Sequence, residues 1–343
     1  MKNTQNLLSV IRLKKYFPLP KKGLFSKTRP YLHAVEEVSL DIRKGEVFGL
    51  VGESGCGKST FGRTLLQLYA PTSGEVVYYG NGEGMDLTKI KPDEMRALRK
   101  DLQIIFQDPY SSLNPRKTVG QLIEEGVATH RFYRRGSPQM REYVTEIMQK
   151  CGLQPYMLHR YPHQFSGGQR QRICIARALA VKPKFIVCDE CVSALDVSIQ
   201  SQILNLLAQL KETEGLTYLF ISHDLSVVRY ISDRIGVMYL GRIVELGDAE
   251  QVFSKPLHPY TVALVSAIPS IEGSGEKILL TGGIPDAANP PEGCPFHPRC
   301  FMAQSRCKTG EVPFTEVEKG RFVRCHFAAV CTDAKRKIAL GKE

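Results

Sequence analysis

A chain of 343 residues that is 43% apolar can bury a large core, either as one large domain with an appendage or as two moderate domains. It has no run of about 18 apolar residues, and its start lacks the layout of a secretory leader, so we expect neither a membrane span nor export. The net charge of +11 comes mostly from residues 1–33, whose eight basic and no acidic residues predict a contact with anionic lipid or nucleic acid, or else a solvated basic arm.

Two strands are expected near the N-terminus. Residues 9–17 alternate between apolar and polar side chains, prolines and a glycine then break the pattern, and residues 34–42 resume it. The first strand ends at Phe17, an aromatic residue that we place against an adenine ring. The alternative for Phe17 is an ordinary core or surface position.

The stretch GESGCGKST, residues 52–60, follows a buried apolar strand over residues 47–51 and leads into a helix that begins at Lys58. Its glycines leave backbone N–H groups free for phosphate oxygens, and the helix N-terminus adds its positive dipole end. Lys58 adds an ammonium for the β- and γ-phosphates, and the Ser59 hydroxyl suits Mg²⁺. The stretch predicts a nucleotide site, with Cys56 as a small filler and not a nucleophile, built from Gly52, Ser54, Gly55, Cys56, Gly57, Lys58, Ser59 and Thr60.

The next buried strand, over residues 102–106, is followed by Gln107, whose amide oxygen could bind Mg²⁺ or hold an attacking water. A lone Gln at a strand end is otherwise structural. Residues 119–160 are expected to be helical, with a break at residues 136–138.

A second anion-binding helix N-terminus is predicted within FSGGQRQRICIARALA, residues 165–180. Ser166 is a suitable N-cap, and Gly167 and Gly168 permit close backbone approach ahead of Gln169. Because one such helix and one phosphate loop occur in the chain, we expect a site shared between two chains, in which Ser166, Gly168 and Gln169 close over the partner's γ-phosphate.

Two carboxylates end a further buried strand over residues 185–189. Asp189 suits Mg²⁺, and Glu190, on the other side of the pleat, can polarise a water for in-line attack. The strand over residues 217–221 delivers His223, which could sense the γ-phosphate at the same edge of a parallel sheet. Cys188 and Cys191 flank the carboxylates at a strand end, so no redox role is expected for them.

The C-terminal tail holds four of the ten cysteines within 32 residues, namely Cys294, Cys300, Cys307 and Cys325. The tail is rich in Gly and Pro and has few helical or strand patterns, so four thiolates around one centre would order it. The spacings lack the C-x2-C pairs of structural zinc sites and suit a [4Fe–4S] cluster. The alternatives are zinc, with His297 or His326 as a substitute ligand, and no metal or disulfides. Because the tail lies far in sequence from the nucleotide motifs, its role is expected to be structural or regulatory.

Over about residues 7–250 the chain resembles the ATP-binding cassette ATPases. The resemblance rests on six motifs in the family's order: the phosphate loop, Gln107, the SGGQ of residues 166–169, Asp189 with Glu190, the SALD of residues 193–196 and His223. The resemblance implies an α/β P-loop nucleotide-binding domain with a mostly parallel sheet core, an antiparallel β subdomain and a helical subdomain over about residues 107–180. It also implies a small, irregular, Cys-rich C-terminal appendage. The ATPase domain would span residues 1–250 and the extension residues 251–343. The implied catalytic residues are Glu190, His223 and Gln107, and the implied Mg²⁺ ligands are Ser59, Gln107 and Asp189. One departure is Cys191, which stands where the family usually has Pro.

The segment of residues 241–269, with its His258-Pro-Tyr-Thr261, is similar to an extension found on ATPase subunits of oligopeptide, dipeptide and nickel importers. Residues 106–116 and 188–207 are similar to the F-type ATPase subunit of peptide permeases. The resemblance implies a subunit that hydrolyses ATP with Mg²⁺ at the cytoplasmic face of the plasma membrane and drives import of dipeptides or oligopeptides. Cysteine patterns similar to those of the tail hold a [4Fe–4S] cluster in such ATPases. The implied partners are a second paralogous ATPase in a heterodimer, two transmembrane permease subunits and an extracytoplasmic peptide-binding protein, and no nucleic acid is expected.

Three alternatives remain open from the sequence. The same architecture could import nickel or another small solute. A cassette ATPase acting on ribosomes or DNA would suit the basic arm, but the chain has a single cassette and only about 105 residues between phosphate loop and SGGQ. A redox-responsive binding module would rest on the cysteines alone.

Overall fold

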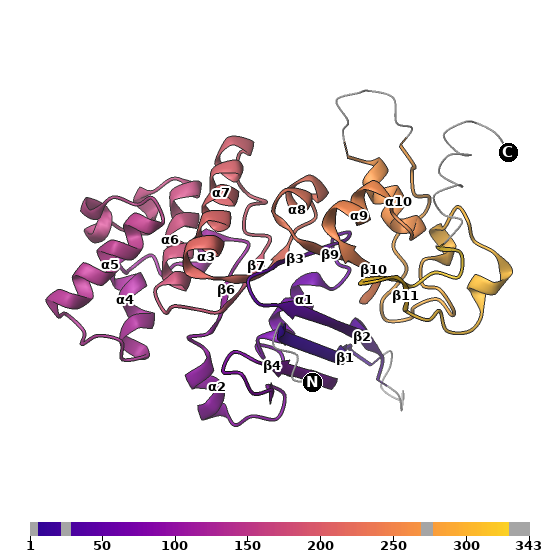
Figure 1. Cartoon of the computed structure of the whole chain (residues 1–343), viewed down its shortest axis with the longest axis horizontal. Helices are drawn as coiled ribbons and strands as arrows, with labels where there is room; N and C mark the ends of the chain where they lie inside the picture. Colours follow the sequence, from indigo (N-terminus) through magenta and orange to yellow (C-terminus); the bar gives the residue numbers. More distant parts are fainter. Residues whose placement is uncertain (1–5, 22–28, 269–276, 329–343) are drawn as a thin grey trace. The chain divides into compact units, whose positions relative to one another are not determined.

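The computed structural model describes residues 6–21, 29–268 and 277–328 (Figure 1). The chain divides into two compact units, and each is assembled from separate segments of the sequence. The first contains Met1–Leu8, Ile42–Glu46 and Val77–Ile221, and the second contains Ser9–Asp41, Val47–Val76 and Ser222–Glu343. In the part of the chain that the structure describes, no helix has both the length and the apolarity that crossing a bilayer requires.

The first unit has a parallel sheet in the order β8-β7-β6, with β6 at Leu102–Ile105, β7 at Phe185–Asp189 and β8 at Thr217–Ile221. Figure 1 labels β6 and β7. The residues of β7 and β8 are all buried, as continuous apolar runs in parallel sheets usually are. Ile104 pairs with Val187 and Val187 pairs with Leu219, so the three strands end at one edge. The residues that follow β6 and β7 therefore emerge side by side.

Helices of the first unit form the helical region that the sequence predicts. In Figure 1, α4 (Val119–Thr129) and α5 (Pro138–Lys150) lie beside α6 (Gly167–Leu179), and the short α3 (Pro109–Ser112) also packs on α6. The predicted break is confirmed, because α5 begins at Pro138 with Ser137 as its N-cap. The unit also contains α2 (Pro92–Leu98), α7 (Val197–Glu214) and the 3-10 turns η1 (Pro155–His159) and η2 (Pro162–Gln164).

The second unit is built on five strands in the order β3-β9-β10-β12-β11. β3 (Val47–Val51) is parallel to β9 (Arg234–Tyr239), which pairs antiparallel with β10 (Arg242–Asp248). The helix α8 (Leu225–Ile231) packs on β3, where a Cβ at Gly49 would lie 2.4 Å from Val228, so glycine permits this close packing. The other helices are α1 (Lys58–Leu65), α9 (Ala249–Ser254) and α10 (Pro259–Ser266).

A further sheet has the order β2-β1-β4-β5, with β1 at Asn6–Pro18, β2 at Tyr31–Arg43, β4 at Ser73–Tyr78 and β5 at Met85–Asp86. The two strands expected near the N-terminus are therefore present, and each is longer than the alternating pattern indicated. This sheet and the mostly parallel strands confirm the predicted α/β class.

The C-terminal appendage is more regular than predicted. The strands β12 (Arg321–Val323) and β11 (Thr315–Glu318) form a hairpin, and β12 pairs with β10 through Glu245 opposite Val323. Two short 3-10 turns, η3 (His297–Arg299) and η4 (Ser305–Lys308), precede them. Most of residues 277–328 lack helix and strand, as predicted, and the short hairpin is an addition that the sequence did not indicate, because strands of 3 and 4 residues are too short to show an alternating pattern.

Candidate functional site

The predicted phosphate loop joins β3 to α1, and its glycines adopt backbone angles that other residues rarely adopt. Gly52, Gly55 and Gly57 have φ values of 151°, 81° and 106°. A Cβ at Gly52 would lie 2.2 Å from the Met238 carbonyl oxygen, and a Cβ at Gly57 would lie 2.0 Å from the Ala34 carbonyl oxygen. Glycine is therefore required at these two positions by conformation and by space.

Lys58 lies inside the curve of this loop and is 4% exposed. Its Nζ donates to the carbonyl oxygens of Gly52 at 2.7 Å and Glu53 at 3.0 Å. Cys56 is buried beside it, and burial raises the pKa of the Cys56 thiol, so the side chain is a neutral filler as the sequence suggested. The loop thus presents glycine backbone and one ammonium, which is a donor set that fits a polyphosphate.

Gln107 and Glu190 meet in the first unit, although they lie 83 residues apart in the sequence. The Gln107 Nε2 donates to the Glu190 carboxylate at 2.9 Å, because β6 and β7 are neighbouring strands. The Glu190 N–H donates to the Ile221 carbonyl oxygen at 3.0 Å. Glu190 has a φ of 50°, a strained conformation for a non-glycine residue that recurs at functional sites. Asp189, the last residue of β7, is buried at 1% exposure.

The cysteines that flank these carboxylates are buried. A hydrogen bond to Cys191 and burial both raise the pKa of the Cys188 thiol. A neutral buried thiol is a poor nucleophile.

The helix α6 begins with a capping box. The Ser166 Oγ accepts from the Gln169 N–H at 3.3 Å, and the Gln169 side-chain oxygen accepts from the Ser166 N–H at 3.1 Å. Ser166 itself is exposed and accessible to a second molecule. Gly168 is buried, and a Cβ there would lie 2.4 Å from Ile199 of α7, so within this chain its glycine permits α6 to pack on α7.

His223 follows β8, and the structure assigns it to the second unit with the phosphate loop. The neighbouring Ser222 N–H donates to the Leu50 carbonyl oxygen at 3.3 Å, which fixes the chain before His223 against the end of β3. The His223 side chain is exposed. It therefore lies at the strand edge from which the phosphate loop departs.

Phe17, the residue proposed for adenine, is half-buried near the end of β1. Its ring makes an edge contact with Tyr69 at a centroid distance of 5.5 Å, and the Lys15 Nζ lies 4.8 Å from its centroid. Because side chains alternate along a strand, Lys15 and Phe17 share one face and Lys14 and Tyr16 share the other.

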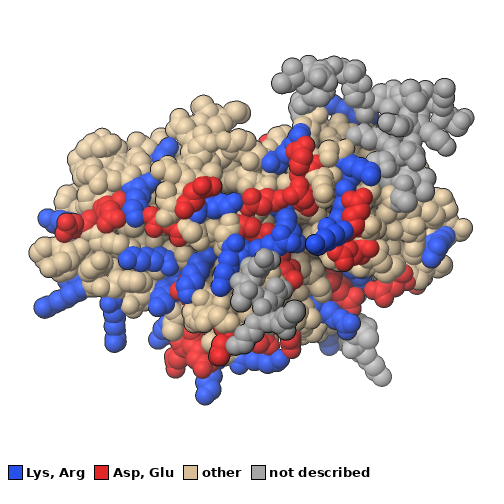
Figure 2. Space-filling view, viewed as in Figure 1, with Lys and Arg blue, Asp and Glu red and all other residues tan. Residues whose placement is uncertain are grey.

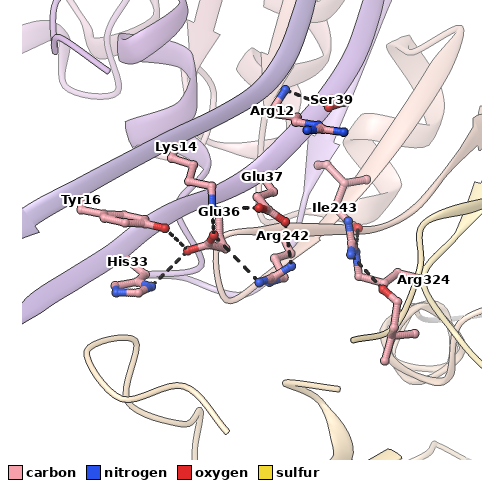
Figure 3. Close-up of polar contacts among 11 residues, drawn as sticks. Arg12, Lys14, Tyr16, His33, Glu36, Glu37, Ser39, Arg242, Ile243 and Arg324 are labelled. Atoms are coloured by element: carbon pink, nitrogen blue, oxygen red, sulfur yellow. Dashed lines mark hydrogen bonds and ion pairs between the residues drawn. The ribbon is translucent and has the colours of Figure 1, made fainter. Parts of the chain in front are cut away.

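That other face carries a polar network that the sequence did not predict (Figure 3). The Lys14 Nζ lies 3.0 Å from Glu36 and 2.8 Å from Glu37, and the Tyr16 hydroxyl donates to Glu36 at 2.6 Å. Burial alone would raise the pKa of Glu36, but the hydrogen bonds from Tyr16 and Lys14 outweigh it and the pKa is lowered. The alternation of β1 was the available signal, but the acidic partners on β2 could not be assigned from it.

The network also bears on the basic N-terminal arm. Lys14 is paired with carboxylates, so part of the excess charge is neutralised within the fold. Residues 22–28 of the arm lie outside the described residues. A cavity of about 560 Å³ adjoins the network and is lined in part by Lys14, Tyr16 and Arg242.

The four tail cysteines line one cavity of about 20 Å³, together with His258, His297 and His326. The Cys294 N–H donates to the Cys307 carbonyl oxygen at 2.9 Å, which joins two of the four segments. Burial raises the pKa of Cys300 to about 12 and that of Cys325 to about 11. Within residues 6–21, 29–268 and 277–328, however, no three or more His, Cys, Asp or Glu side chains are arranged as a metal site. The cavity has room for about one water molecule, so the segments that carry the four cysteines would have to move apart for a cluster to fit between them.

A strand, a glycine cradle with a buried lysine and a helix define a P-loop nucleotide-binding protein. Residues 35–193 match the family described as ABC transporter, and residues 244–307 match the family described as oligopeptide/dipeptide transporter, C-terminal region. The chain therefore belongs to the ATP-binding cassette transporter ATPases, and within them to the ATP-binding proteins with the oligopeptide/dipeptide C-terminal region.

Several relatives match along almost the whole chain. The oligopeptide transport ATP-binding protein AppF of Bacillus subtilis (strain 168) is 49% identical over 329 residues, which cover 94% of this chain and 98% of AppF. OppF of Escherichia coli (strain K12) is 50% identical over 306 residues, which cover 88% of this chain and 90% of OppF. The solved dimeric post-hydrolysis structure of the ATP-binding cassette MJ0796 bound to ADP and Pi has a TM-score of 0.61 and 29% identity, covering 71% of this chain and 98% of that one. These relatives favour a transport ATPase over an ATPase that acts on ribosomes or DNA.

Proposed function

We propose that this chain is the ATP-hydrolysing subunit of an importer of dipeptides or oligopeptides. The observation that supports this most is that the similarity to oligopeptide and dipeptide transport ATP-binding proteins includes the C-terminal region and not only the cassette. In this proposal residues 1–250 form the ATPase domain and residues 251–343 form the extension.

ATP is held by the phosphate loop and by Phe17. The glycines of the loop give the phosphates a backbone cradle, and the Lys58 ammonium faces the β- and γ-phosphates with the helix α1 dipole behind it. Ser54, Cys56 and Thr60 complete the loop, and Phe17 stacks on the adenine ring. The geometry that supports this is the buried Lys58 and the space at Gly52 and Gly57 that only glycine can fill.

Hydrolysis depends on residues at the ends of the buried strands. Ser59, Gln107 and Asp189 are the residues that would hold Mg²⁺, which would supply positive charge to the phosphate oxygens. Glu190 accepts a proton from water, and the Gln107 Nε2 donor at 2.9 Å fixes the orientation of its carboxylate. His223 would sense the γ-phosphate.

The assembly that fits this role contains two ATPases. The exposed Ser166, with Gly168 and Gln169, would close over the γ-phosphate that a paralogous partner holds. At the second site, the corresponding segment of the partner would close over the γ-phosphate that this chain holds. Two permease subunits supply the membrane path, an extracytoplasmic binding protein delivers the peptide, and the chain attaches to the permeases at the cytoplasmic face. In Figure 2, basic and acidic side chains are interspersed over the face in view, which suits protein partners better than nucleic acid.

We also propose that Cys294, Cys300, Cys307 and Cys325 bind a [4Fe–4S] cluster. The support is the donor set, since four thiols from separate segments line one cavity. Binding would require the loss of the thiol protons, which burial now retains. Stoichiometric zinc with His297 or His326 is the competing assignment.

The test is reconstitution of the complex with its permease subunits in proteoliposomes, followed by measurement of phosphate release and labelled peptide uptake. Glu190→Gln keeps an oxygen acceptor for Gln107 but loses the base, so turnover should fall by about 10²- to 10⁴-fold while ATP binding is retained. Glu212→Gln makes the same chemical change at an exposed position of α7 and should have no effect. Near-normal hydrolysis by Glu190→Gln would contradict the assigned base, and ATP hydrolysis without peptide uptake would contradict the cargo.

A further inference from the structure

The phosphate loop is held by two residues of the C-terminal extension, and both act on Glu53. Arg299 forms a bidentate ion pair with the Glu53 carboxylate, with Nη1 to Oε2 at 2.7 Å and Nη2 to Oε1 at 3.0 Å. Tyr260 accepts a hydrogen bond from the Glu53 N–H on its phenolic oxygen at 2.8 Å. These contacts join positions that are 246 and 207 residues apart in the sequence.

Both residues of the extension are rigidly placed. The Arg299 side chain is 6% exposed, and Tyr260 is fully buried. The Tyr260 ring packs against the rings of Tyr239, at a centroid distance of 4.7 Å, and Phe296, at 5.4 Å, which also contact each other at 5.2 Å. A buried phenol packed in a cluster of three rings keeps its oxygen at a fixed point, and a bidentate guanidinium fixes both distance and orientation.

Glu53 connects these residues to the lysine of the site. Its carbonyl oxygen accepts from the Lys58 Nζ at 3.0 Å, so the N–H, the carboxylate and the carbonyl of Glu53 are held by Tyr260, Arg299 and Lys58 respectively. A displacement of Glu53 would therefore move a partner of Lys58. In addition, the Glu53 carboxylate lies within a loop that must accept a polyanion, and without Arg299 its negative charge would repel phosphate.

We propose that Arg299 and Tyr260 are positioning residues for nucleotide binding, which neutralise and fix Glu53 so that the C-terminal extension sets the affinity of the phosphate loop. The inference rests on the proposed function, because it assumes that the loop binds ATP. It assigns to the extension a part in ATP binding that the sequence did not suggest, since Arg299 lies between Cys294 and Cys300, far along the chain from the phosphate loop.

The test is equilibrium binding of a fluorescent ATP analogue with Mg²⁺ to the full-length chain. Arg299→Gln should weaken binding by about 10- to 100-fold, the range expected when the partly buried Glu53 carboxylate loses a bidentate charged partner. Adding Glu53→Gln to Arg299→Gln should recover most of that loss, since no uncompensated charge remains. The affinity of Arg299→Lys should lie between those of the unmodified chain and Arg299→Gln, because lysine keeps the charge but not the bidentate geometry. Arg306→Gln, an exposed arginine in the same tail, is the matched control and should bind like the unmodified chain.

The outcomes separate this inference from the proposed function. Failure of the unmodified chain to bind the analogue would overturn the nucleotide site itself. If the unmodified chain binds, an Arg299→Gln variant of equal affinity would overturn the positioning role alone, as would a double variant as weak as the single one. Thermal unfolding of each variant checks that it is folded. If Arg299→Gln does not fold, Tyr260→Phe, which removes one oxygen and keeps the ring, decides the matter, and unchanged affinity in that variant would overturn the inference.

Discussion

Gly57→Ala should destabilise the chain more than Gly55→Ala, a substitution in the same loop. The two glycines have φ values of 106° and 81°, so alanine at either position costs about 1–2 kcal/mol in backbone strain. At Gly57 the added Cβ would also lie 2.0 Å from the Ala34 carbonyl oxygen, whereas at Gly55 it meets no atom within 4 Å. Carbon–oxygen contacts are normally about 3.3 Å or longer, so the loop or β2 must move by about 1 Å. Overpacking of this kind costs about 1–3 kcal/mol more, which gives about 2–5 kcal/mol for Gly57→Ala.

Equilibrium urea unfolding of the full-length variants measures this difference. The free energy of unfolding of Gly57→Ala should be about 1–3 kcal/mol below that of Gly55→Ala. Its affinity for an ATP analogue should fall as well, because Lys58 follows Gly57 and would shift relative to the Gly52 and Glu53 carbonyls. Equal stability of the two variants would refute the argument that the β2 backbone limits the loop at Gly57.

Three further predictions concern the shared site, the tail and the polar network. Ser166→Arg should leave ATP binding by the isolated chain unchanged but block hydrolysis by the assembled pair, and loss of binding by the isolated variant would contradict a site shared between chains. Anaerobic purification should yield about four irons per chain, lost in Cys300→Ser, whereas stoichiometric zinc or a metal-free protein with an ordered tail would reject the cluster. Because the pKa of Glu36 lies below its ordinary value of 4.5, its stabilising effect should be complete above about pH 4.5 and be lost as the pH falls through the lowered value. Urea unfolding at several pH values should therefore show a flatter acid limb in Glu36→Gln, and identical limbs would count against the network.

The sequence by itself determined the local features of the site. Each of these features is encoded within a few residues. Glycine positions define the phosphate loop, cap chemistry places Ser166 at the start of α6, and apolar runs define the strands that end at Asp189 and Ile221. These signals depend on backbone conformation and periodicity, which neighbouring residues fix. The helical pattern of residues 119–160 indicated the helical region, whereas the α/β class was implied by the resemblance of the ordered motifs to a known family.

The tertiary structure alone decided which distant side chains meet. The Gln107 to Glu190 hydrogen bond spans 83 residues and follows from the pairing of β6 with β7, which the strand patterns did not specify. The strand β12 exists because it pairs with β10, and Arg299 reaches Glu53 across 246 residues. Such partners depend on how whole elements pack, and neither charge nor periodicity along the chain distinguishes a buried arginine that holds the phosphate loop from an exposed one in the same tail.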